Sequence, residues 1–261
     1  MIDMKHFLKE LLKKYGHIWI LGYGFIYLPW FMHLEKTVTS NYHIMHSSLD
    51  DMIPFNEYFV IPYLLWFAYV TAAIAYLFFK NKEEYYRLCA FLFTGMTLSL
   101  LICTLFPNGT DLRTAVNPDK NLCSRLVYML HQADTNTNVF PSIHVYNSIG
   151  THIAVMKSES LKKHKVIRIL SGILMVAICM ATVSLKQHSV LDVAGAILLS
   201  AAIYPLVYAG RTNQNIFAKG FLKTSKHKLA PKYDRCQLFI CDKSPPAAAI
   251  TKTRSLTFIT W

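Results

Sequence analysis

The chain has 261 residues, of which 53% are hydrophobic and only 16% are charged, and its mean hydropathy is +0.29. This composition excludes an ordinary soluble domain of this size and indicates a membrane protein. The formal net charge is +12, but the positive residues are distributed as in a membrane protein, so we do not expect a nucleic-acid partner. The six cysteines form no disulfide framework and no CxxC pair.

The first residues are basic and partly apolar. Segment 1–16 carries four lysines interleaved with Phe7, Leu8, Leu11 and Leu12. This pattern is typical of a short amphipathic helix on the inner leaflet, or of a basic flank that fixes the orientation of the first span. Both interpretations stay open, and 1–16 is treated as a basic amphipathic N-terminal segment.

Six apolar runs follow, each near the length of about 20 residues that a membrane span requires. They are 17–34, 58–79, 88–106, 139–156, 166–184 and 189–209. The first run is long, contains several aromatic residues and lacks a small-residue cleavage site, so we expect a retained span rather than a signal peptide. The fold prediction is an all-α bundle of six transmembrane helices over 17–210, followed by a basic, weakly ordered tail, 211–261.

The Lys and Arg residues predict the orientation of this bundle. With the N-terminus inside, the inner segments hold 22 of the 27 Lys and Arg residues, and the imbalance persists without the tail. The positive-inside rule therefore predicts a multi-pass protein of the cell membrane with both termini in the cytoplasm.

Two short polar fragments stand at the outer ends of predicted spans. Pro141-Ser142-Ile143-His144 begins the fourth span, and His188 to Asp192 begins the sixth. His188 and Asp192 are four residues apart and share one face of a helix, so the carboxylate can accept one imidazole N–H and leave the other ring nitrogen free. The predicted topology places both fragments at the outer membrane face.

The same face carries groups suited to a phosphate ester. Two helix N-termini and the side chains of Arg113, Lys186 and Ser142 can bind phosphate oxygens. One histidine can attack phosphorus while the other protonates the leaving oxygen. A zinc site formed by His144, His188 and Asp192 is the alternative, but adjacent cations suit an anion better than a metal. We therefore expect no metal and no cofactor.

These residues resemble the type 2 phosphatidic acid phosphatase superfamily of membrane lipid phosphatases. Its three motifs are a Lys and Arg-Pro element, Pro-Ser-Gly-His, and Ser-Arg-x5-His-x3-Asp. Asp111-Leu112-Arg113 is similar to the end of the first, residues 141–144 to the second with Ile143 for Gly, and residues 188–192 to the end of the third. The resemblance implies His188 as nucleophile, His144 as acid, Asp192 as orienter of His188, and Arg113 with Ser142 as phosphate ligands.

The chain departs from these motifs where the family has cations. Phe106 stands at the Lys position of the first motif, Thr114 follows Arg113 in place of Pro, and Ala181 and Thr182 replace the Ser-Arg pair. Lys186 is a candidate replacement ligand. This pattern is similar to the divergent branch that includes inositolphosphotransferase-like and sphingomyelin-synthase-like enzymes.

The resemblance implies a lipid phosphatase acting at the outer leaflet on a phosphomonoester or pyrophosphate. Candidate substrates are phosphatidic acid, phosphatidylglycerophosphate and polyprenyl pyrophosphate. The departures leave two alternatives open: a phosphotransferase that uses a lipid alcohol as acceptor, and a catalytically degenerate membrane transport or partner-binding protein.

Other polar residues are predicted to have no part in the chemistry. His152 is expected to be a hydrogen-bonded helix contact. The residues expected at solvated loop surfaces are His43, His46, Asp50, Asp51, Arg125, His131 and Asp134.

Overall fold

The computed structural model describes residue 10 and residues 13–208. All of these belong to the first of two compact units, Met1–Asn215. Most of the predicted N-terminal segment 1–16 and the whole predicted tail 211–261 lie outside the described residues.

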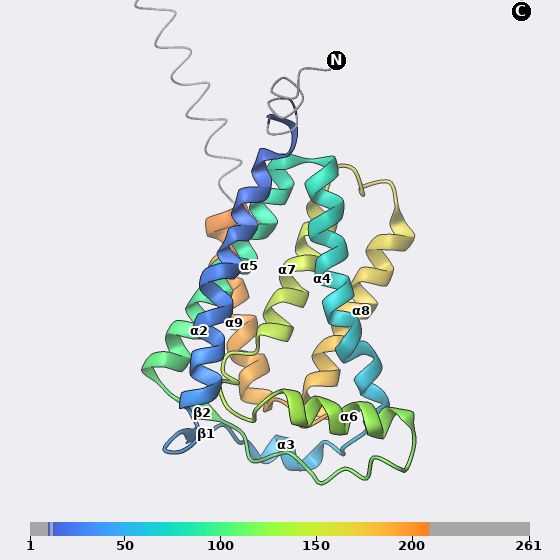
Figure 1. Cartoon of the computed structure of the whole chain (residues 1–261). Coiled ribbons are helices and arrows are strands. Elements are labelled where there is room, and N and C mark those ends of the chain that lie inside the picture. The colour runs from blue at the N-terminus through green and yellow to red at the C-terminus, as the bar shows by residue number, and fades with distance from the viewer. Residues whose placement is uncertain (1–9, 11–12, 209–261) are drawn as a thin grey trace, which may run out of the picture. The chain divides into compact units, whose positions relative to one another are not determined.

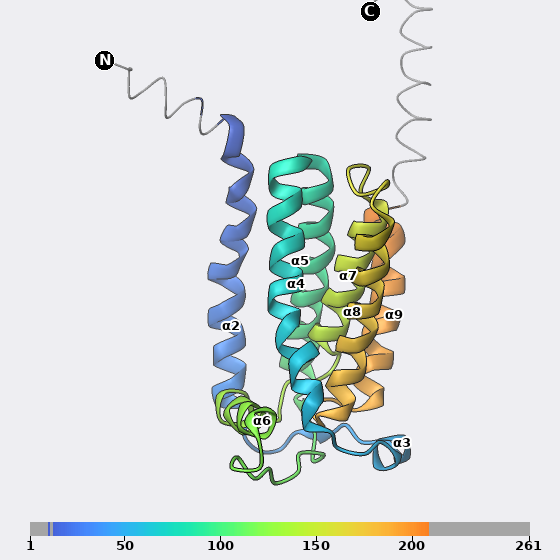
Figure 2. The same cartoon turned by 90° about the vertical axis from the view of Figure 1, so that its right-hand side faces the viewer.

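The described chain is mostly helical, as expected (Figure 1). The long helices α2, α4, α5, α7, α8 and α9 run side by side, and α3, α6 and the two strands gather at one end of them (Figures 1 and 2). Two two-residue strands, β1 and β2, pair in parallel beside that end. In chain order the elements are η1 (Gly16–Tyr23), α2 (Gly24–Thr37), β1 (His43–Ile44), α3 (Ser48–Met52), η2 (Glu57–Phe59), α4 (Val60–Lys80), α5 (Lys82–Leu105), β2 (Asn108–Gly109), α6 (Leu122–Ala133), α7 (Ile143–Lys157), α8 (Lys165–Ser184) and α9 (Val190–Tyr208).

Four helical segments are long and apolar enough to cross a membrane. They are Glu57–Lys80, Lys82–Leu105, Lys165–Ser184 and Val190–Tyr208, and they match four of the predicted spans. The helices in the other two predicted spans are shorter. Helix α2 has 14 residues and follows the 3-10 helix η1, and α7 has 15 residues. Large apolar side chains such as Ile173 and Leu198 are exposed on the outside of this bundle, as expected for a surface that contacts lipid.

Helix caps explain where the boundaries differ from the apolar runs. The side chain of Asn81 accepts hydrogen bonds from the backbone N–H groups of Glu83 and Glu84, so α5 begins six residues before its predicted span. Ser142 caps α7 through Val145 N, so that helix begins after the predicted boundary. Apolar content predicts a span, whereas local hydrogen bonding determines its first turn.

The centre of the bundle is a contact between α5, α7 and α9. The ring of Tyr146 packs on Gly95, where an added Cβ atom would lie 2.0 Å from the ring, and Phe91 packs in the same way on Gly150. The Tyr146 hydroxyl donates to the Phe91 carbonyl oxygen. Small residues at these positions allow α5 and α7 to approach each other closely.

Helix α6 lies between the third and fourth predicted spans, 88–106 and 139–156, where the sequence predicted no helix. Asn121 caps it, and its buried Val127 packs with Val60 and Tyr63 at the start of α4. Leu122 and Met129 are exposed on another part of its surface. The helix crosses the foot of the bundle between α2 and α4 (Figure 2).

A substitution at Gly95 tests the packing of Tyr146 of α7 against α5. Gly95→Ala forces a methyl group into the Tyr146 ring, so we expect a loss of about 1–3 kcal/mol of stability. Thermal unfolding of the purified protein in detergent measures it. Gly22→Ala is the matched control because its added Cβ meets nothing within 4 Å, and equal melting temperatures for the two variants would contradict the packing described.

Candidate active site

The two polar fragments identified in the sequence are bonded to each other. His188 Nδ1 lies 3.2 Å from Asp192 Oδ2, and the same carboxylate oxygen accepts from Ser189 N at 2.9 Å. The backbone N–H of Ser142 donates to the carbonyl oxygen of Asp192 at 3.2 Å, which joins the start of α7 to the first turn of α9. The predicted pairing of His188 with Asp192 is therefore present, with Asp192 fully buried.

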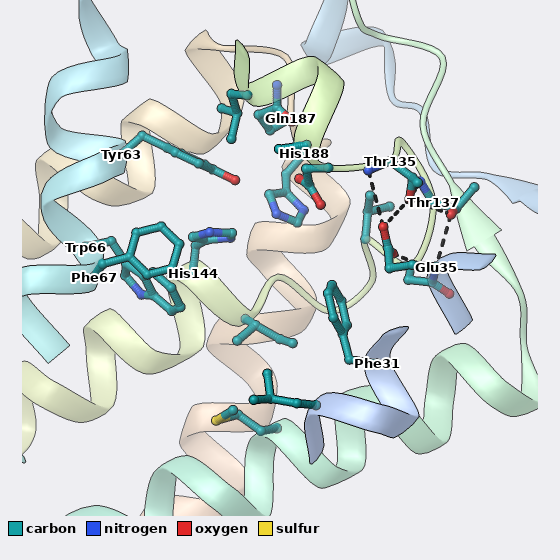
Figure 3. Close-up of a pocket in the computed structure, with 18 of the residues that line it drawn as sticks. Phe31, Glu35, Tyr63, Trp66, Phe67, Thr135, Thr137, His144, Gln187 and His188 are labelled. Atoms are coloured by element: carbon teal, nitrogen blue, oxygen red, sulfur yellow. Dashed lines mark hydrogen bonds between the residues drawn. The ribbon is translucent and has the colours of Figure 1, made fainter. Parts of the chain in front are cut away.

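His144 and His188 lie next to each other at one end of a cavity (Figure 3). Their ring centroids are 5.7 Å apart and their planes meet at 61°. Tyr63 and Trp66 of α4 pack on His144, each with a ring centroid 4.5 Å away. In the tautomer of His188 that donates from Nδ1 to Asp192, Nε2 carries no proton, so this arrangement could supply a nucleophile beside a second proton-transferring group.

The cavity has a volume of about 480 Å³. Its polar end, at the foot of the bundle, holds the two histidines, Gln187, and the segment 134–138 after α6. The rest is mainly apolar and aromatic, and its walls are α2 and α4, with Met96 of α5 between them. The full lining is Tyr27, Leu28, Phe31, Glu35, Tyr63, Trp66, Phe67, Val70, Thr71, Met96, Leu130, Ala133, Asp134, Thr135, Thr137, Asn138, Val139, Ile143, His144, Gln187 and His188. A small polar group at one end and an apolar chain along the rest would match this lining.

Asp50 holds the α9 end of the site in place. Its carboxylate accepts from Ser189 Oγ at 2.6 Å and from Val190 N at 2.8 Å, and its main-chain oxygen accepts from the Lys186 ammonium. His188 lies between these anchored residues in the chain. Asp50 is 1% exposed, so the prediction that it lies on a loop surface is wrong. A buried carboxylate needs such donors, and α9 provides them at its N-terminus.

The predicted phosphate ligands all have partners within the protein. The Arg113 guanidinium donates to the carbonyl oxygens of Asp134 and Thr135 and to Gln187 Oε1, at 2.6 to 2.7 Å. Lys186 binds Asp50, and the Ser142 hydroxyl caps α7. None of the three lines the cavity. The N-terminus of α9, predicted to be free for an anion, is instead bound by the Asp50 carboxylate.

Two carboxylates, from Glu35 and Asp134, border the polar end of the cavity. Glu35 accepts from Thr135 N, Thr135 Oγ1 and Asn138 Nδ2, which ties α2 to the segment after α6 (Figure 3). Asp134 lies 3.5 Å from Arg113. Burial raises the pKa of the Asp134 carboxyl, and Arg113 opposes this rise. Asp134 was predicted to be a solvated loop residue, and its place in the cavity wall corrects that prediction.

The remaining sequence predictions divide between surface and interior. His43, His46, Asp51 and Arg125 are exposed, as expected, and His46 bridges Asp51 and Asp111. His152 bonds Ser171 of α8 at 3.0 Å, which confirms the predicted helix contact. His131, expected to be solvated, is partly buried, and burial next to Arg113 lowers its pKa to about 4.

Sequence reasoning missed the roles of Asp50, Glu35 and Gln187. Asp50 had a usable signal, because Ser47 and Asp50 form a capping box around the first turn of α3 and such a spacing marks a structured turn. Glu35 and Gln187 had none, because their partners are 100 and 74 residues away in the chain. Across residue 10 and residues 13–208, no group of three His, Cys, Asp or Glu residues is placed to hold a metal ion.

Replacement of Asp50 tests its positioning role. Asp50→Asn removes the charge and turns an amide N–H₂ toward backbone and hydroxyl donors, so we expect the protein to lose about 2 kcal/mol of stability. The melting temperature in detergent measures this loss. Asp51→Asn, at the neighbouring exposed position, is the control, and an equal effect of both changes would contradict the role of Asp50.

Comparisons with known proteins add no relative to this description. No family model, no curated protein and no solved structure matches the chain. The candidate roles of His188, His144 and Asp192 therefore rest on their geometry and chemistry.

Proposed function

We propose that the chain is a membrane enzyme that cleaves a phosphate ester of a lipid through a phosphohistidine on His188. The observation that carries this proposal is the pair of histidines at the polar end of a largely apolar cavity, with His188 oriented by buried Asp192. A lipid combines the two chemistries that the lining accommodates, a phosphate at the histidines and an acyl or prenyl chain between α2 and α4.

The reaction would proceed in two displacements. His188 Nε2 attacks phosphorus, a P–N bond forms as the P–O bond to the lipid breaks, and His144 gives a proton to the departing oxygen. In the second step His144 takes a proton from water or an alcohol, whose oxygen attacks phosphorus and releases His188. General acid–base assistance of this kind contributes on the order of 10²–10⁴ in rate.

Hydrolysis is the simplest outcome, with water as acceptor, and it matches the phosphatase resemblance. Transfer to a lipid alcohol is the second candidate. It is favoured by the mainly apolar cavity lining, which would admit a second lipid more readily than bulk water, and by the departures from the phosphatase motifs at Phe106 and Thr182.

The proposal includes six spans, both termini in the cytoplasm, and the histidines at the outer leaflet. The imbalance of Lys and Arg supports this orientation. Four segments meet the length and hydropathy of a span, and α2 and α7 run alongside them in the bundle (Figure 2).

Purified protein in maltoside detergent, supplied with a panel of lipid phosphates and a chelator, tests the chemistry. We expect His188→Ala to lower turnover by on the order of 10³-fold or more, because it removes the nucleophile. His144→Ala should lower it by about 10²–10⁴-fold. Phosphate release and new lipid products are measured together, which separates hydrolysis from transfer.

His152→Ala is the matched control, because His152 also lies on α7 but bonds Ser171 outside the cavity. Its turnover should stay near that of the unaltered protein. Full activity in His188→Ala would overturn the phosphohistidine scheme. A lack of turnover throughout the panel, together with a lack of vanadate binding, would favour the degenerate, non-enzymatic alternative.

Cysteine labelling tests the orientation. Cys123 of α6 lies at the histidine end, whereas Ser160 lies in the turn between α7 and α8 at the opposite end. In proteins that retain only Cys123, or only a cysteine from Ser160→Cys, a membrane-impermeant maleimide should label intact cells at Cys123 alone. The residue 160 variant should react only after permeabilisation. The reverse pattern would contradict the proposed orientation.

A further inference from the structure

A second polar cavity lies at the end of the bundle away from the two histidines. Helix α5 begins there, α7 and α9 end there, and α8 begins there after the turn 158–164 (Figure 2). The cavity has a volume of about 420 Å³. Its lining includes four cations and two carboxylates, which leaves two net positive charges. These six residues are Arg87, Lys157, Lys162, Arg168, Glu84 and Glu159.

Two of the four cations have no carboxylate partner. No ion pair among residue 10 and residues 13–208 includes Lys157 or Arg168. The Arg168 guanidinium donates to Met156 Sδ and to the main-chain oxygen of Lys162, each at 3.3 Å, and both acceptors are neutral. Lys157 Nζ lies 5.7 Å from the centroid of the Tyr204 ring. Uncompensated cations that line one cavity attract an anion, and a guanidinium can bind two phosphate oxygens at once.

The other charged groups of this cavity bond within the protein. Arg87 pairs with Glu83 on the same helix, and Lys162 Nζ lies 3.6 Å from Glu159 Oε2. Glu84 Oε1 accepts from the backbone N–H of Glu159 at 3.1 Å, which ties α5 to the turn after α7. These contacts fix the walls of the cavity and leave the two unpaired cations available to a ligand.

A mainly apolar hollow on the outside of α7 and α8 adjoins this cavity. Met156 and Arg168 line both of them. The hollow continues along α8 past Ile169 and Ile173, whose side chains are each 61% exposed. Exposed apolar side chains on a helix that spans a membrane face acyl chains. Cations beside an apolar surface match a phospholipid, which joins a phosphate to an acyl chain, better than a soluble phosphate.

We infer that this cavity binds the phosphodiester headgroup of an anionic phospholipid. Lys157 and Arg168 bind the phosphate oxygens, and an acyl chain lies along Ile169 and Ile173. In the orientation proposed above, the lipid belongs to the inner leaflet. The inference does not rest on the proposed reaction, because neither histidine takes part in it.

Native mass spectrometry of the full-length protein in detergent tests the ligand. The probes are dioctanoyl phosphatidylglycerol, phosphatidylinositol and phosphatidylcholine, together with glycerophosphoglycerol, the first headgroup without its chains. We expect each anionic lipid to bind about fivefold or more tightly than phosphatidylcholine, whose ammonium the cations repel. Equal binding of phosphatidylcholine would overturn the anionic preference. Glycerophosphoglycerol should bind at least about tenfold more weakly than its lipid, and equal binding would overturn a lipid as the source of the phosphate.

Charge-removing variants assign this binding to the cavity. Lys157→Gln and Arg168→Gln should each weaken binding of phosphatidylglycerol about fivefold and change that of phosphatidylcholine little. Lys163→Gln is the matched control, because it removes the same charge from the same turn and Lys163 lines neither the cavity nor the hollow. An equal loss in all three variants would show attraction to net charge alone and overturn the site.

A variant of opposite sign separates ligand binding from damage to the fold. Glu159→Gln releases Lys162 from its ion pair and should strengthen binding of phosphatidylglycerol about fivefold, which misfolding would not do. Unchanged affinity in Glu159→Gln and in both cation variants overturns the inference. Lipid phosphate turnover in the same variants is a separate readout, so loss of this site leaves the histidine chemistry standing, and an inactive His188 leaves this site standing.

Discussion

The candidate site depends on the Asp50 carboxylate bound at the N-terminus of α9. It holds Ser189 and Val190 directly and Lys186 through its main chain, so the chain on both sides of His188 is fixed to a segment near residue 50. Asp192 then needs only to orient one ring. A carboxylate on a helix N-terminus is stable, and here it occupies the place where an anionic ligand would otherwise bind.

Much of the candidate site could be predicted from the sequence, and part of it could not. His188 with Asp192, and the location of His144 beside them, follow from helical spacing and from the alternation of apolar spans. Arg113, Ser142 and Lys186 were predicted as ligands from their residue types and their place at the predicted outer face, and for Arg113 and Ser142 also from the family resemblance. Each of them bonds elsewhere in the protein. A side chain's charge can be read from the sequence, but its partner depends on long-range packing, as with Glu35 and Thr135.

The fold shows a similar division. Apolar content predicted α4, α5, α8 and α9, with a six-residue shift at the start of α5, because a helix that spans a hydrocarbon layer needs about 20 mostly apolar residues. It missed α6, whose apolar residues alternate with polar ones and whose partners, Val60 and Tyr63, lie on α4. That helix and the α2 carboxylate complete the cavity, so the elements least visible in the sequence shape the space around the two histidines.

The distance in sequence between Asp50 and its donors has a consequence for biosynthesis. Ser189 Oγ and Val190 N are 139 and 140 residues downstream of Asp50. The Asp50 carboxylate therefore lacks these two hydrogen-bond donors until most of the chain has been translated. An unpaired carboxylate is costly in hydrocarbon but not in water. In the membrane arrangement proposed above, this end of the bundle would assemble where the membrane meets water, and the site would be complete only after the last helix is in place.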